Sequence, residues 1–186
     1  FLVVALNHPG DNFSDLSRAG DISIMFQRPR DIKRLLDFLL ADWPQSTKID
    51  PDRIGFFGFS RGGYTGLVLA GAVPDFHDST VPCPEPAPIC GEIRRNEIPA
   101  DPLVGDPRIK ALVLADPLSF FSTKESLKAV GAPIQFSNSS AGPSRLSARV
   151  DRGGDNRPVR VEAEAEKEKP RRSGAFGVIS MAPVFV

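Results

Sequence analysis

The segment Gly58-Phe59-Ser60-Arg61-Gly62 is the first part of the sequence whose residue types could carry chemistry. A serine between two glycines is also typical of a surface turn, so the flanking residues must decide between the two interpretations. An apolar run over 54–59 predicts a buried strand before the serine, and small residues over 61–70 predict a helix after it. Such a turn exposes the serine hydroxyl at the carboxyl end of a sheet, where ligands bind. The context therefore favours a nucleophilic serine at position 60.

Two further groups needed for acyl transfer are expected next to Ser60. The backbone N–H of Arg61 opens the predicted helix, where unpaired N–H groups favour an anion, so we predict it as a donor to the oxyanion. Asp116 ends the predicted strand 109–116, which is the strand after the one that carries the serine. Its carboxylate is expected at the same sheet edge and is the candidate triad acid, although an aspartate before a proline is also a common turn residue.

A general base is missing from the expected place. The order along the chain in this arrangement is serine, acid, histidine, whereas the two histidines of this sequence, His8 and His77, both precede Asp116. His8 follows the first predicted strand and would lie at the same sheet edge, but His-Pro-Gly is also typical of a strand-ending turn, which we favour. His77 lies in the proline-rich excursion. The sequence therefore predicts a nucleophile and an acid without their histidine, and impaired turnover.

Alternating strands and helices predict the α/β class with a mostly parallel sheet. We expect strands at 1–6, 54–59, 109–116 and from 132, and helices at 29–43, 61–70 and 124–130. The proline-rich excursion 73–107 is predicted to be a loop or a cap. Few aromatic residues and an alternating charged block predict a disordered or non-native tail over 137–186, which leaves 1–136 as the folded domain.

Composition excludes some classes of function. A length of 186 residues with 41% hydrophobic residues suits one domain. The formal net charge of +0 gives no basic face for nucleic acid, and no apolar run approaches the roughly 20 residues that span a bilayer. The chain opens at Phe1 inside a predicted strand, so we expect an upstream segment. The sequence leaves the oligomeric state open.

Two cysteines, Cys83 and Cys90, lie in the proline-rich stretch 81–91. They fit either a small disulfide-closed loop or two free thiols, and both alternatives stay open here. A metal site is disfavoured because no other ligands flank the pair. A disulfide would favour a periplasmic or secreted protein over a cytoplasmic one.

Four segments, 7–12, 27–31, 52–63 and 115–117, together resemble bacterial predicted dienelactone hydrolases, which are similar to the platelet-activating-factor acetylhydrolases. The resemblance runs from Ala5 to about Ile134. It implies a partial α/β-hydrolase fold and a carboxylic-ester hydrolase that acts on a small-molecule ester or lactone through an acyl-enzyme. It also implies Ser60 as the nucleophile, Asp116 as the acid, and neither a metal nor an organic cofactor.

This chain departs from that family at both ends. Relatives carry further strands and a His-Gly oxyanion loop before the position of Phe1, and they continue beyond the strand at 134 to the catalytic histidine. Here an arginine- and glutamate-rich sequence follows, so we hypothesise a reading-frame shift or a gene-model error near Gln135, which translation of the other two frames would test. The alternative function is a catalytically dead fragment or a non-enzymatic binding module; a peptidase on the same fold is neither favoured nor excluded.

Overall fold

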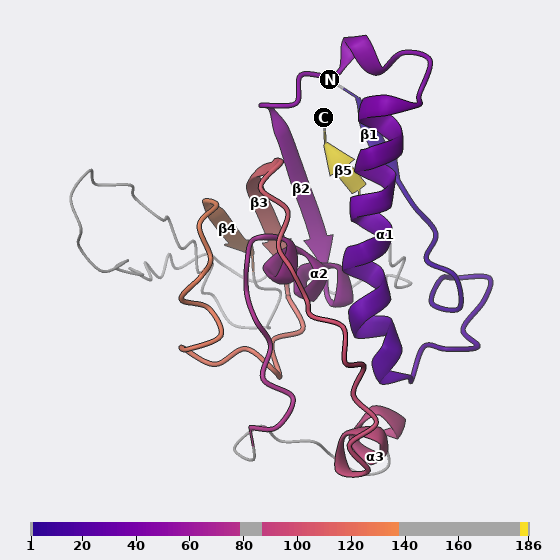
Figure 1. Ribbon diagram of the computed structural model, residues 1–186, viewed down its shortest axis with the longest axis vertical. Coiled ribbons are helices and arrows are strands. Elements are labelled where there is room, and N and C mark those ends of the chain that lie inside the picture. The colour runs from indigo at the N-terminus through magenta and orange to yellow at the C-terminus, as the bar shows by residue number, and fades with distance from the viewer. Residues whose placement is uncertain (1, 79–86, 138–182, 186) are drawn as a thin grey trace, which may run out of the picture.

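A five-stranded sheet forms the centre of the structure (Figure 1). The computed structural model describes residues 2–78, 87–137 and 183–185. The strands are β1 (Val3–Ala5), β2 (Ile54–Phe59), β3 (Ile109–Ala115), β4 (Ile134–Ser137) and β5 (Pro183–Phe185), in the sheet order β1-β5-β2-β3-β4. The helices are α1 (Ile22–Ala41), α2 (Arg61–Leu69) and α3 (Pro88–Arg94), with one 3₁₀ turn, η1 (Ser46–Lys48).

Three neighbouring strands of this sheet are parallel. Strand β2 pairs with β3, and β3 pairs with β4, so that Phe59 lies opposite Ala115 and Ala115 lies opposite Ser137. The carboxyl ends of β2, β3 and β4 consequently meet at one edge of the sheet. The prediction of parallel strands with flanking helices is confirmed for this part of the chain. Strand β5 lies between β1 and β2 and is antiparallel to both.

Helices α1 and α2 pack together on the sheet. Ile32 of α1 and Leu67 of α2 belong to the same buried cluster as Phe56 and Leu114 of the sheet. The strand residues that alternate with these are less deeply buried, and Val113 of β3 is 38% exposed. Burial of the cluster supplies the main stabilisation of the two helices, because apolar area removed from water is the dominant favourable term in folding.

Helix α1 begins at Ile22, so the predicted start at position 29 was wrong by seven residues. Pro29 lies inside the helix, where its ring removes one backbone hydrogen bond. The preceding turns bury Ile22, Met25 and Phe26 against Tyr64 of α2. Burial of these side chains offsets the missing hydrogen bond, and this tertiary effect is not visible in the local sequence.

One other expectation about the elements needs revision. Residues 124–130 form turns instead of a helix, because Ser126 donates its hydroxyl to Thr123 O and accepts the N–H of Val73 at its carbonyl. The excursion 73–107 contains α3, and residues 79–86 of it lie outside the described residues. In the predicted tail, residues 138–182 also lie outside them, whereas Pro183–Phe185 form β5. None of the helices in the described ranges is long and apolar enough to cross a bilayer.

Candidate active site

Ser60 occupies the turn between β2 and α2 in a backbone conformation that serine rarely adopts. Its φ is 52° and its ψ is −113°, in the region that glycine enters without strain. Three backbone hydrogen bonds hold it there: its N–H donates to Ala115 O at 3.0 Å, and its carbonyl accepts from Tyr64 N–H at 3.1 Å and Leu118 N–H at 2.9 Å. Strained residues of this kind cost about 1–3 kcal/mol and cluster at active sites.

Two glycines are required by the close approach of backbone around Ser60. A Cβ on Gly58 would lie 2.2 Å from Gly62 O, and a Cβ on Gly63 would lie 2.6 Å from Pro117 Cα. Both distances are too short for any side chain. Gly58 therefore permits the tight turn, and Gly63 lets the first turn of α2 touch the segment that follows β3. Nothing in the local sequence indicated the second contact.

Asp116 lies at the same sheet edge as Ser60, as predicted. The two residues directly follow Phe59 and Ala115, which are partners in the parallel ladder. Asp116 also has a positive φ, 40°, and its N–H donates to Ser137 O at 2.8 Å. The parallel pairing of β2 and β3 therefore places the candidate nucleophile and the candidate acid on adjacent strand ends.

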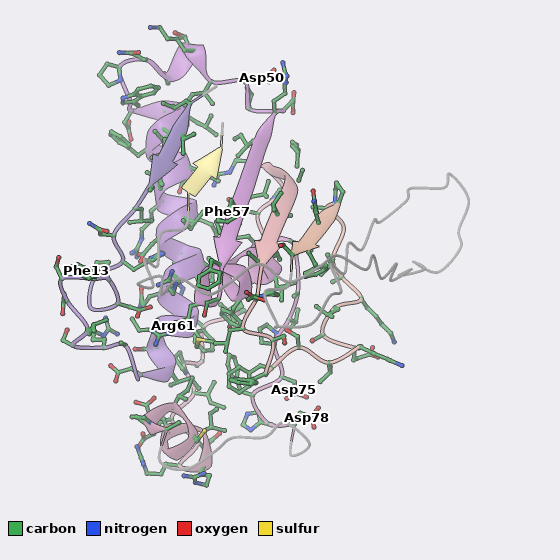
Figure 2. All side chains as sticks on the ribbon, turned by 180° about the vertical axis from the view of Figure 1, so that it is seen from behind. Phe13, Asp50, Phe57, Arg61, Asp75 and Asp78 are labelled. Atoms are coloured by element: carbon green, nitrogen blue, oxygen red, sulfur yellow. The ribbon has the colours of Figure 1, made fainter. Side chains whose placement is uncertain are left out.

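Arg61 is the first residue of α2, so its N–H has no acceptor within the helix and is available to an oxyanion. Its guanidinium forms an ion pair with the buried carboxylate of Asp11, which lies in the loop after β1. Figure 2 labels Arg61, which lies beside α1. The other oxygen of Asp11 accepts from Arg28 Nη1 of α1 at 2.6 Å. Burial lowers the pKa of the Arg28 guanidinium, and the hydrogen bond that Arg28 donates to Asp11 opposes that shift. One carboxylate thus joins the loop after β1, helix α1 and the first residue of α2.

His8 is a buried histidine held by a carboxylate. Its Nδ1 lies 2.8 Å from Asp31 Oδ2, and its side chain is 4% exposed. Its backbone carbonyl accepts from Asp11 N–H at 3.1 Å and from Asn12 Nδ2 at 2.8 Å. The segments 7–12 and 27–31 therefore bind each other through His8–Asp31 and through the Asp11–Arg28 ion pair. The sequence singled out both segments but did not predict that their residues pair. The only hint of this pairing in the sequence was that α1 carries charged residues as well as an apolar face.

His77 is exposed, and it lies between Asp75 and Asp78 in the segment after α2. Its N–H donates to Asp75 Oδ1 at 2.9 Å, and Figure 2 shows Asp75 and Asp78 beyond the ends of the strands. Among the hydrogen bonds and ion pairs of the described residues, none joins His8 or His77 to Ser60. The candidate nucleophile and the candidate acid therefore lie at one edge of the sheet, and among the described residues no histidine is bonded to the serine.

No family model, curated protein or solved structure matches this chain. The resemblance to dienelactone hydrolases therefore rests on the quoted sequence segments alone, and what it implies about activity is taken up below as a proposal.

Cys90 lies in α3, is buried, and is disulfide-bonded. The sequence contains one other cysteine, Cys83, which lies outside the described residues. A crosslink at Cys90 restrains α3, the helix that lies close to the beginning of α1.

Proposed function

We propose that this chain carries the nucleophile and the acid of a serine-dependent carboxylic-ester hydrolase of the α/β-hydrolase type. The substrate class is a small-molecule ester or lactone. The observation that carries the proposal is the backbone of Ser60, with φ 52° and ψ −113° between a buried strand and a helix. Glycine would fill this position without strain, so a serine there points to a role for its hydroxyl.

The proposed reaction uses groups at this edge of the sheet. Ser60 Oγ attacks the ester carbonyl carbon and forms a tetrahedral intermediate, whose oxyanion accepts a hydrogen bond from Arg61 N–H. The C–O bond to the leaving group then breaks, an alcohol departs with a proton, and Ser60 is left acylated. Attack of water on the acyl-enzyme releases the carboxylic acid and restores the serine. In a lactone, the alcohol and the acid belong to the same product molecule.

The proton of the Ser60 hydroxyl needs an acceptor. His8 does not meet Ser60: among the hydrogen bonds of the described residues its Nδ1 is bonded to Asp31, and its Nε2 is buried without a partner. Loss of a triad base slows turnover by about 10⁴- to 10⁶-fold. We therefore propose that acylation by this chain is slow and depends on solvent as the base.

One observation favours a second candidate, a catalytically dead fragment or non-enzymatic binding module: neither histidine of the sequence is bonded to Ser60. The two proposals differ in whether Ser60 ever becomes acylated. Mixing the protein with p-nitrophenyl acetate and following nitrophenolate release separates them. The hydrolase proposal predicts one equivalent of release, absent in Ser60→Ala, and the binding module predicts identical traces for the two proteins.

A further inference from the structure

A cavity of about 300 Å³ lies beside the Ser60 turn. It opens to solvent between the beginning of α1, α3 and residues 118–121, and most of its wall is apolar. The side chains that matter here are Ile24, Met25, Ile89, Leu118, Phe120 and Phe121. Its volume is at the lower end of the range of about 300–1,000 Å³ that is typical of ligand pockets.

Two residues that adjoin Ser60, the candidate nucleophile, form part of the cavity wall. Arg61, which follows Ser60 in the chain, contributes to the lining, and so does Leu118. The N–H of Leu118 donates to the carbonyl of Ser60 at 2.9 Å. If the carbonyl oxygen of an ester accepts a hydrogen bond from Arg61 N–H, the acyl chain of that ester can therefore reach the cavity.

The charges of the lining are already partnered. Arg61 forms its ion pair with Asp11, and the carboxylate of Asp21 lies 3.7 Å from Arg18 Nε. A charged group on a ligand would therefore meet no unpaired opposite charge among these residues, and its desolvation would be uncompensated. The cavity is chemically suited to an uncharged chain.

The aromatic wall is preformed by packing. Phe121 is 4% exposed, and its ring centroid lies 4.7 Å from that of Phe76. Phe76 in turn stacks on Phe26 of α1, with centroids 5.3 Å apart. On the other side, Cys90 of α3 is 2% exposed. A wall that is ordered before binding reduces the entropic cost of holding a ligand.

We propose that this cavity binds the uncharged apolar chain of the ester, which makes the substrate class one of short- to medium-chain esters without a charged end. The inference rests on the proposed function, and it names the substrate selected by that same site.

The test measures binding separately from chemistry. In Ser60→Ala, titration calorimetry with methyl butanoate, methyl hexanoate and methyl octanoate should show Kd falling about fourfold for each added methylene. The monomethyl ester of hexanedioic acid, which ends in a carboxylate, should bind at least tenfold more weakly than methyl hexanoate. A Kd independent of chain length, or equal binding of the charged ester, would overturn the proposal.

Two matched variants, each with one alanine replaced by phenylalanine, locate the binding site. Ala19 lines the cavity, whereas Ala41 is exposed at the other end of α1. In the Ser60→Ala background, Ala19→Phe should remove the dependence on chain length, and Ala41→Phe should leave it unchanged. Thermal melting checks that both variants fold. If a folded Ala19→Phe variant binds the series as its parent does, the chain occupies another place and the proposal fails.

Failure of this inference and failure of the proposed function give different results. Loss of the chain-length dependence while wild-type Ser60 is acylated removes the cavity from the account and keeps the nucleophile. An intact chain-length series with no acylation of wild-type Ser60 refutes the hydrolase and, with it, the assignment of the bound chain to an ester substrate.

Discussion

Replacing Ser60 by glycine should stabilise the protein relative to replacing it by alanine. The φ of 52° and ψ of −113° impose strain on any residue that has a Cβ, and alanine keeps that atom. Relief of about 1–3 kcal/mol of strain is offset by about 0.5–1 kcal/mol of extra backbone entropy that glycine loses on folding. Ser60→Gly should therefore exceed Ser60→Ala in free energy of unfolding by about 1 kcal/mol, or roughly 2–4 °C in Tm.

Urea denaturation and thermal melting of the two variants measure this difference. The control is Ser23, which lies in helix α1 and is not among the residues with positive φ. There the order should reverse, with Ser23→Gly about 1 kcal/mol less stable than Ser23→Ala, because glycine is a poor helix former. If Ser60→Gly is equal to or less stable than Ser60→Ala, Ser60 is unstrained and the reasoning about its role is refuted.

Three further perturbations follow from the contacts around the site. Gly63→Ala should cost about 1–3 kcal/mol of stability through overpacking against the proline after Asp116, whereas Gly131→Ala, with nothing within 4 Å of its Cβ, should change the urea midpoint little. Asp11→Asn should cost about 3–5 kcal/mol in the same assay, since it leaves buried arginine without its carboxylate; a loss below 1 kcal/mol would show that this ion pair is not needed. Burial acts to raise the pKa of Asp106, but its hydrogen bond from Arg108 prevails and holds the pKa below 3.8. This carboxylate therefore stabilises the fold above pH 3.8 and loses that contribution as pH falls through its lowered pKa. Asp106→Asn should flatten the acid side of the plot of unfolding free energy against pH. An unchanged plot would contradict a stabilising role for the Asp106 carboxylate.

The sequence predicted those parts of the site that depend on local signals. A buried strand, a Gly-x-Ser-x-Gly turn and a helix of small residues adjoin one another along the chain, so the position of Ser60 followed from neighbouring residues. The position of Asp116 at the edge that carries Ser60 was also predicted, because alternating strands and helices imply parallel pairing and parallel strands end at one edge. The structure agrees through the register of Phe59 with Ala115.

Features that depend on distant residues could not be predicted in the same way. The start of α1 at Ile22 depends on burial against Tyr64, and the pairing of His8 with Asp31 joins residues 23 positions apart. The contact of Gly63 with Pro117 is also a product of packing between β3 and α2. No periodicity or motif reports such contacts, because they exist only when the elements are assembled.

The measurement that tests the central claim most directly is labelling of Ser60 by a fluorophosphonate with and without added imidazole. Imidazole supplies in solution the general base that the proposal leaves to solvent, and a positioned base contributes about 10²- to 10⁴-fold to such a reaction. Mass spectrometry of the digested protein should find the adduct on Ser60 alone, formed slowly in buffer and much faster with imidazole, and no adduct in Ser60→Ala. Absence of an adduct on Ser60 under both conditions would contradict the claim that this turn presents a nucleophile.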